Sequence, residues 1–356
     1  MIEKITERNV WDVLKETKLP IILYGMGNGA DMVIEELHKI GRDFEDIFAG
    51  DKFVRGQLFH GKRVKTYSEI CETYDDFFVL MCFAVHDDET IEFVKSIAAA
   101  HPFAAPNVPI VNDGIFTREF IERHDKEFDA AFALLADEES RQNYINILNF
   151  KVSGKIEYLF KSEKNKAEIY KNILSVGKDE TFVDLGAYNG DTIEEFISAA
   201  GAYKKIFAFE ADSNNFRKLK KNTEALGNIE LYNLAAWDKK ETLLFEKKKG
   251  RNSKLSSSGT VEISADSVDN IINEPITILK MDIEGSEEKA ILGAEKAIRT
   301  CKPKLYVCAY HRNSDMFALP LLISSIDSSY RFYFYHQRYI PAWESNFYGI
   351  VKQIKI

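Results

Sequence analysis

Cysteine is scarce in this chain of 356 residues, which has only Cys71, Cys82, Cys301 and Cys308. No two of them stand in a C-x-x-C spacing, so the pattern favours neither a zinc knuckle nor a framework of disulfides. We therefore expect reduced thiols that are mostly buried, because a free cysteine behaves as a small apolar residue.

The chain also has fewer positive than negative side chains, and it has no long apolar run. Lys and Arg number 47 against 56 Asp and Glu, and the formal net charge of −9 gives no general attraction to nucleic acid or an anionic membrane. The N-terminal segment MIEKITERNVWDVLKE is too polar for a signal peptide, and no apolar run reaches the ~20 residues of a membrane span. We expect a cytoplasmic protein whose partner is a small-molecule or glycan substrate, with no nucleic acid and no membrane.

The chain does have length and an ordinary globular composition, with 45% apolar and 29% charged residues. This length favours two domains. Strand and helix patterns alternate in two stretches, which predicts an α/β fold with two Rossmann-like domains. We place an accessory domain at 1–116, a helical connector at 117–175 and the second domain at 176–356, with a solvent-exposed, Ser-rich loop at 247–259. The oligomeric state is not readable from the sequence, and a homodimer is compatible with it.

The second domain is organised around the stretch FVDLGAYNGD, residues 182–191. A short apolar run ends in a glycine-punctuated turn, and an amphipathic segment follows, so the pattern indicates strand, tight loop and helix. Gly186 and Gly190 let the backbone approach a ligand closely, and the start of the helix offers unpaired amides. Asp184 stands at the carboxyl end of the strand, where open α/β sheets bind their ligands. The stretch therefore predicts a cofactor site, although a βα turn with ordinary glycines is the alternative.

A second acid, Glu210, ends the next apolar run and lies 24 residues after Gly186. An acid near that offset accepts hydrogen bonds from ribose hydroxyls in nucleotide-binding folds. The loop lacks the full G-x-G-x-x-G spacing, which argues against a pyrophosphate cofactor and favours S-adenosylmethionine, which has no phosphate. Ala236 and Trp237 follow the third strand, a region that frames the adenine in this fold class. The predicted cofactor-binding residues are Asp184, Gly186, Ala187, Tyr188, Asn189, Gly190, Asp191, Thr192, Glu210, Ala236 and Trp237.

Two further acids and a histidine are predicted beside this site. The run at 276–283 is mostly apolar, as in a central parallel strand, and Asp282 and Glu284 come at its carboxyl end. Residues two apart on an extended segment point the same way, so both acids face one cleft if the strand geometry persists through Glu284. His311 follows another strand. We predict His311 or Asp282 as general base and Glu284 as a ligand of substrate hydroxyls.

The alternative is that Glu284 pairs locally and His311 only orients a neighbour. The strand that leads to His311 contains no acid, so a carboxylate that orients the imidazole must come from elsewhere in the fold. Asp282 and Glu284 could also hold a divalent cation, but two carboxylates without further spaced ligands are a weak signal, so we assign no metal ligands.

Four segments together resemble the FkbM-type family of SAM-dependent methyltransferases: FVDLGAYNGDT, FAFEAD, LKMDIEGSEEKAILGAEKAI and CAYHR. The most specific is KMDIEGSE, residues 280–287, which is close to a signature of that family. The resemblance covers roughly the last half of the chain. It implies a methyltransferase-type sheet that ends in an antiparallel hairpin, here 331–337 and 346–354. It also implies methylation of a hydroxyl on a carbohydrate, sugar nucleotide or secondary metabolite.

The first domain has its own glycine-rich turn. Gly25, Gly27 and Ala30 match G-x-G-x-x-G/A between a strand and a helix, and Asp51 lies 26 residues after Gly25. Two interpretations stay open: a nucleotide or sugar nucleotide bound at Gly25–Ala30, or glycines that serve only strand-to-helix packing.

Two rival functions follow from these motifs. One is a non-catalytic nucleotide- or sugar-binding protein with a degenerate methyltransferase domain, against which the intact Asp184, Gly186, Gly190 and Glu210 argue. The other is an NAD-dependent oxidoreductase that uses the turn at 25–30, but no hydride-transfer constellation accompanies that turn.

Overall fold

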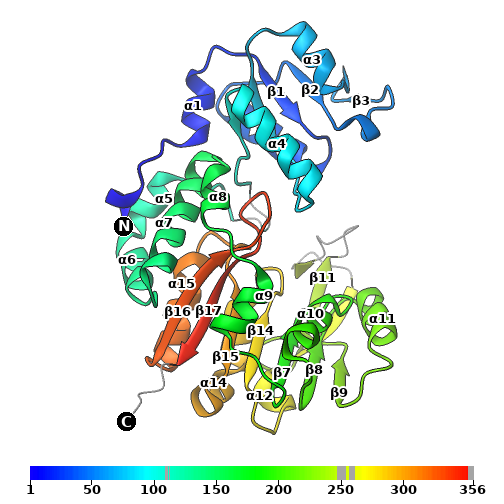
Figure 1. The fold of residues 1–356 in the computed structure, drawn as a ribbon, viewed down its shortest axis with the longest axis vertical. Coiled ribbons are helices and arrows are strands. Elements are labelled where there is room, and N and C mark those ends of the chain that lie inside the picture. The colour runs from blue at the N-terminus through cyan, green and yellow to red at the C-terminus, as the bar shows by residue number, and fades with distance from the viewer. Residues whose placement is uncertain (109–110, 112, 247–253, 256–260, 352–356) are drawn as a thin grey trace. The chain divides into compact units, whose positions relative to one another are not determined.

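The computed structural model describes residues 1–108, 111, 113–246, 254–255 and 261–351. It divides into two compact units (Figure 1). The first comprises Met1–Lys126, Gln142–Glu163 and His336–Glu344, and the second comprises Glu127–Arg141, Lys164–Tyr335 and the chain from Ser345. The predicted connector therefore contributes to both units. Each unit has its own parallel sheet, so the α/β fold class with two Rossmann-like domains is confirmed.

The first unit contains a four-stranded parallel sheet in the order β2–β1–β5–β6. Its strands are β1 Ile21–Tyr24, β2 Asp46–Phe48, β5 Phe78–Met81 and β6 Phe103–Ala104, with the small hairpin β3 Leu58–Phe59 and β4 Lys62–Arg63. Its helices include α1 Val10–Glu16, α2 Asn28–Lys39, α3 Tyr67–Thr73, α4 Asp88–Ala100, α5 Arg118–Arg123 and α8 Glu157–Lys161, with short turns η1 Ile2–Lys4 and η2 Asp51–Phe53. Helices α6 Asp125–Ala133 and α7 Glu138–Ser153 each contribute residues to both units.

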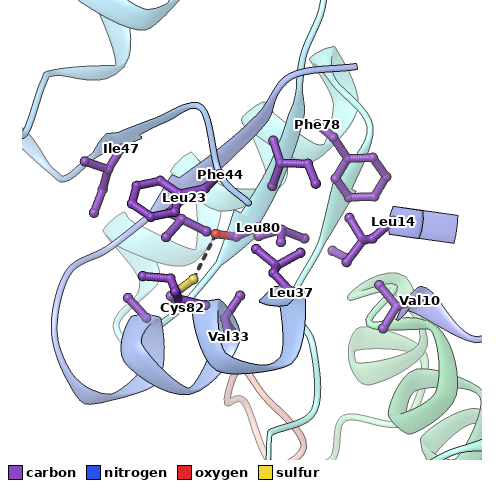
Figure 2. Close-up of a cluster of buried hydrophobic side chains, with 14 of the residues drawn as sticks. Val10, Leu14, Leu23, Val33, Leu37, Phe44, Ile47, Phe78, Leu80 and Cys82 are labelled. Atoms are coloured by element: carbon purple, nitrogen blue, oxygen red, sulfur yellow. Dashed lines mark hydrogen bonds between the residues drawn. The ribbon is translucent and has the colours of Figure 1, made fainter. Parts of the chain in front are cut away.

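An apolar core holds this first unit together (Figure 2). Strands β1 and β5 are buried along their whole length, which matches their continuous apolar sequence. Helix α2 buries Ala30, Val33, Ile34 and Leu37, the spacing of one amphipathic face. In the same core, Sγ of Cys82 donates a hydrogen bond to the carbonyl of Leu80 over 3.3 Å. The Gly-rich turn is thus built into a packed β–α layer.

The second unit contains a seven-stranded sheet in the order β16–β17–β15–β14–β7–β8–β9. Strands β15, β14, β7, β8 and β9 pair in parallel, and β17 runs antiparallel to β15. The strands are β7 Thr181–Leu185, β8 Lys205–Phe209, β9 Ile229–Tyr232, β14 Ile278–Met281, β15 Lys304–Cys308, β16 Tyr330–His336 and β17 Ser345–Val351. A smaller sheet contains β10 Ala235–Ala236, β11 Glu241–Glu246, β12 Lys254–Leu255 and β13 Val261–Asp266.

Helices connect these strands. They are α9 Lys166–Glu168, the π-helical turn η3 Ile169–Ile173, α10 Asp191–Ala200, α11 Ser213–Asn222, α12 Val268–Ile271, α13 Glu287–Gly293, α14 Glu295–Cys301 and α15 Asp315–Ile326. The predicted loop at 247–259 lies outside the described residues except for 254–255, and so do the last residues of the predicted strand 346–354.

The stretch at 286–299 forms two helices, α13 and α14, which separate at Gly293, where an added Cβ would lie 1.9 Å from the carbonyl oxygen of Trp237. The turn between β16 and β17 is a loop that belongs to the first unit. There Ile340 forms a β-bridge with Val85, and Nε of Arg338 lies 2.6 Å from Oδ1 of Asp88.

The four cysteines are free, with Cys82 and Cys308 buried, Cys71 exposed and Cys301 between these extremes. Within the part of the chain that the structure describes, no helix is both long enough and apolar enough to cross a membrane.

Candidate active site

The loop after β7 approaches the end of β14 so closely that it requires glycine. Gly186 has a φ of 82°, and a Cβ at this position would lie 1.8 Å from the carbonyl oxygen of Asp282. The amides of Gly186 and Ala187 both donate to the carbonyl of Phe209, over 3.0 and 2.9 Å. These contacts fix the loop between the ends of β8 and β14.

Glu210, directly after β8, is bound to this loop. Its Oε2 accepts a hydrogen bond from the amide of Tyr188 over 2.9 Å, and its Oε1 accepts one from the amide of Asp212 over 2.7 Å. Tyr188 adopts a left-handed φ of 48°, which turns its amide toward the acid. Glu210 is 8% exposed, and this burial raises its pKa to about 7, although the two amides act in the opposite direction. The structure thus brings the acid predicted for ribose to the predicted loop.

The next four predicted residues form the turn into α10. Oδ1 of Asn189 accepts from the amide of Asp191 over 3.2 Å, and Oδ1 of Asp191 accepts from the amide of Thr192 over 2.9 Å. Gly190 is the N-cap, with a φ of 94°. These hydrogen bonds use backbone amides at the start of α10, and they fix the conformation of the turn.

Ala236 and Trp237 lie on another element of the same unit. Ala236 is buried in β10, and the indole Nε1 of Trp237 donates to Oε1 of Glu241. The Nζ of Lys289 lies 5.6 Å from the centroid of the Trp237 ring. These contacts join the pair to β11 and α13, and its role in framing adenine stays a prediction.

Asp184 is completely buried and faces Lys280 of the neighbouring strand. The two residues are in register on β7 and β14, and Nζ of Lys280 lies 3.0 Å from Oδ1 of Asp184. The same Nζ donates to the carbonyl of Gly186 over 3.2 Å. Burial by itself lowers the pKa of Lys280, but its attraction to Asp184 and Asp282 outweighs burial and raises the pKa above the ordinary value. Asp184 is therefore connected to the loop through Lys280, and a direct contact between Asp184 and a cofactor stays a prediction.

Asp282, Glu284 and His311 come together, as the sequence predicted for one edge of the sheet. Nε2 of His311 lies 3.4 Å from Oδ1 of Asp282 and 3.8 Å from Oε2 of Glu284. Nδ1 of His311 lies 3.0 Å from Oε1 of Glu287, at the start of α13. The hydroxyl of Tyr310 donates to Oδ1 of Asp282 over 3.1 Å. We name Asp282, Glu284, Glu287 and His311 the acid–histidine cluster.

The backbone that carries Asp282 and Glu284 differs from the extended conformation that was expected. Strand β14 ends at Met281, and Glu284 has a left-handed φ of 55°, so the extended geometry does not persist through Glu284. The turn nevertheless places both carboxylates beside the same ring nitrogen, because Gly285, with a φ of 91°, continues the reversal of the chain.

The members of the acid–histidine cluster differ in solvent exposure. The side chains of His311 and Glu287 are each 1% exposed, whereas those of Asp282 and Glu284 are 27% and 40% exposed. Burial by itself lowers the pKa of His311, but the neighbouring carboxylates, Glu287 first, raise it to about 10. A molecule arriving from solvent therefore reaches the two acids before the imidazole.

A further acid, Asp315, lies at the start of α15. It is 3% exposed, and its Oδ2 accepts from the amide of Arg312 over 2.7 Å. Burial and repulsion from Glu287 raise the pKa of Asp315 to about 7. The guanidinium Nε of Arg312 donates to the carbonyl of Gly285 over 2.8 Å, which ties this segment to the turn that carries Glu284.

Sequence reasoning assigned no role to Lys280, Glu287, Tyr310 or Asp315. A signal was present for the first two, because KMDIEGSE begins with Lys280 and ends with Glu287. Glu287 stands four residues after Ile283, and its Oε1 accepts a hydrogen bond from the amide of Ile283 over 3.0 Å. Neither Tyr310 nor Asp315 lies in that motif, although Tyr310 precedes His311 directly.

In the first unit, the glycine-rich turn is closely packed. A Cβ at Gly25 would lie 2.6 Å from Cδ1 of Phe83, and one at Gly29 would lie 2.2 Å from the carbonyl oxygen of Cys82. These contacts give a packing reason for two of the glycines in the turn. They lend no support to a nucleotide or sugar nucleotide at Gly25–Ala30.

The chain is similar to known methyltransferases. The family model of the methyltransferase FkbM domain matches residues 184–339. The crystal structure of a methyltransferase FkbM from Methylobacillus flagellatus KT is 23% identical, with a TM-score of 0.73 over 98% of this chain and 92% of that one. An rRNA methylase from Streptococcus thermophilus is 16% identical, with a TM-score of 0.37 over 53% of this chain and 98% of that one.

A comparison with curated proteins gives no significant match. The matched segment contains Glu210, the loop that begins after Asp184 and the acid–histidine cluster. Residues 184–339 are therefore similar to the methyltransferase FkbM domain.

Proposed function

We propose that the protein is a SAM-dependent O-methyltransferase that acts on a hydroxyl of a carbohydrate, sugar nucleotide or secondary metabolite. The observation that carries this proposal is the carboxylate of Glu210, which the Tyr188 amide holds against the loop at 186–190. A carboxylate at the end of the second strand suits two adjacent ribose hydroxyls, because it offers acceptors only. The close backbone approach at Gly186 supplies the cradle.

The acceptor side lies directly beside this loop. The amide of Asp282 donates to the carbonyl of Leu185 over 3.0 Å, so the end of β14 is bound to the end of β7. The partly exposed side chains of Asp282 and Glu284 then present carboxylates next to the cofactor cradle. Holding donor and acceptor in adjacent positions removes much of the entropic barrier to their reaction.

S-Adenosylmethionine, when bound, supplies a methyl group on a sulfonium that leaves as a neutral thioether. A hydroxyl acceptor must lose its proton as the new C–O bond forms. We assign Asp282 as the general base that takes this proton and Glu284 as a ligand of substrate hydroxyls, because the methyl-accepting substrate can reach both side chains. His311 is the positioning group, since it is buried between Glu287 and Asp282. Between His311 and Asp282, the proposal thus prefers the partly exposed acid as the base.

A small molecule or glycan is the substrate that fits the net charge of −9, which opposes a polyanion. The contacts that join Gly186 and Glu210 to one loop, together with the intact Asp184 and Gly190, argue against the alternative of a degenerate, non-catalytic domain.

Thermal unfolding in the presence of candidate ligands tests the proposal. S-Adenosylmethionine and S-adenosylhomocysteine should both raise the melting temperature, since saturation at 100 times Kd adds about 2.7 kcal/mol of stability. Glu210→Gln should lose most of this shift, and Glu224→Gln, an exposed acid of the same unit, should keep it. A shift with NAD or a sugar nucleotide and none with either sulfur compound would refute the proposal.

A further inference from the structure

Three side chains of the acid–histidine cluster have the arrangement of cation ligands. Asp282, Glu287 and His311 each offer one ligand atom, and these atoms all lie within 4.8 Å of one another. They come from the end of β14, the start of α13 and the end of β15, so three elements fix their positions. Imidazole and carboxylate together form a donor set that first-row transition metals accept.

The cluster holds more negative than positive groups. Three carboxylates, those of Asp282, Glu284 and Glu287, lie within 3.8 Å of the nitrogens of one imidazole. The nearby Lys280 is already paired with Asp184. Buried charge of one sign is costly unless a counter-charge accompanies it.

A second observation is independent of the charge count. Oε2 of Glu287 is buried and has no hydrogen-bond partner among the residues that the structure describes. The two ring nitrogens of His311 are buried and likewise make no hydrogen bond there, although carboxylate oxygens lie 3.0 and 3.4 Å away. Buried polar atoms without hydrogen bonds are rare, and a bound ion is one cause.

We propose that Asp282, Glu287 and His311 bind one divalent transition-metal cation. The inference rests on the proposed function and deepens it, because the ion would lie beside the acceptor. The 27% exposed side chain of Asp282 leaves one side of the site open to an acceptor hydroxyl. The ion would polarise that hydroxyl, and its proton would pass to the second oxygen of Asp282 as the C–O bond forms and the C–S bond breaks.

Manganese is the probe for the test. The full chain is stripped with a chelator and titrated with Mn²⁺, while electron paramagnetic resonance measures the free ion and Zn²⁺ competes for the site. We expect one ion per chain. Glu287→Gln and Asp282→Asn should each weaken binding at least ~10-fold, since even outer-shell partners contribute ~10–100-fold. Glu288→Gln is the matched control, because this exposed acid is adjacent on the same helix.

The absence of stoichiometric binding for both Mn²⁺ and Zn²⁺ would overturn the inference. Binding that survives both Glu287→Gln and Asp282→Asn would also overturn it. Circular dichroism shows whether each variant folds. If the buried Glu287→Gln variant does not fold, metal binding is still measured on Asp282→Asn, because the Asp282 side chain is partly exposed. The thermal shift with S-adenosylmethionine is measured on the same samples. An intact shift without metal binding contradicts only the cation site, whereas a lost shift contradicts the proposed function.

Discussion

Lys280 and Asp184 face each other on the adjacent strands β14 and β7, with 3.0 Å between Nζ and Oδ1 and both side chains closed to solvent. This ion pair links the strand that precedes Asp282 and Glu284 to the strand that precedes the loop at 186–190. It therefore couples the two halves of the site through the core of the sheet.

Breaking this pair should destabilise the fold strongly. Lys280→Met leaves the Asp184 carboxylate buried without its counter-charge, and we expect the free energy of unfolding in urea to fall by ~3–5 kcal/mol. The double variant Asp184→Leu/Lys280→Met should recover most of that loss, because an apolar pair needs no counter-charge. Lys289→Met breaks a more exposed pair with Asp238 and should cost less than ~1 kcal/mol. Equal losses in the two lysine variants would contradict the importance of the buried pair.

Ligand affinity should depend on pH through Glu210. Its pKa of about 7 means that the carboxylate is fully ionised only above neutral pH. If the ionised form accepts the ribose hydroxyls, affinity should rise up to ~10-fold per unit between about pH 6 and pH 7 and level off near pH 8. The probe is 5′-methylthioadenosine, which keeps the ribose and adenine but lacks the titrating amino acid. Calorimetric titration of Glu210→Gln should show a flat profile, and a profile unchanged from the parent would refute this role.

The same group should make the protein less stable as pH rises. The pKa of Glu210 is higher in the folded chain than its ordinary value of 4.5, so the folded state binds more protons between these two values. The free energy of unfolding should therefore fall as pH rises from about 4.5 to about 7. Urea unfolding across this range should show a smaller fall in Glu210→Gln than in the parent. An identical slope in both proteins would argue against the raised pKa.

Gly186→Ala should disrupt the loop more than its backbone angle alone explains. The added methyl would lie 1.8 Å from the Asp282 carbonyl at a φ of 82°, whereas Gly201, with a φ of 75°, has open space around it. Gly201→Ala should cost ~1–2 kcal/mol from the left-handed backbone. Gly186→Ala should exceed that cost by a further ~1–3 kcal/mol in urea unfolding, because the ends of β7 and β14 must separate. Similar costs in the two variants would show that the loop has room to move.

Asp282→Asn should slow methyl transfer while leaving the thermal shift with S-adenosylmethionine intact. Removal of a general base typically costs ~10²–10⁴-fold in turnover. The assay follows release of S-adenosylhomocysteine with an acceptor found by screening hydroxyl compounds. Glu288→Gln, exposed on α13, should keep the parental rate. Full activity of Asp282→Asn would transfer the role of base to another group.

Much of the cofactor loop could be predicted locally. Residues 181–185 form a buried strand because they are a short apolar run, and the glycines at 186 and 190 adopt positive φ where the chain turns into α10. The offset between Gly186 and Glu210 is fixed by one helix and one strand, so the sequence also indicated which acid would meet the loop. Asp282, Glu284 and His311 could be assigned to one edge because carboxyl ends of parallel strands align.

The sequence by itself thus determined the strands, the loop and the edge of the sheet at which Asp282, Glu284 and His311 meet, because these depend on periodicity and on backbone freedom over a few residues. Only the tertiary structure decided that Lys280 pairs with Asp184, that Glu287 meets His311, and that Glu284 turns rather than extends. Those contacts join strands and helices far apart in the chain, and their partners follow from how the sheet packs rather than from spacing along the sequence.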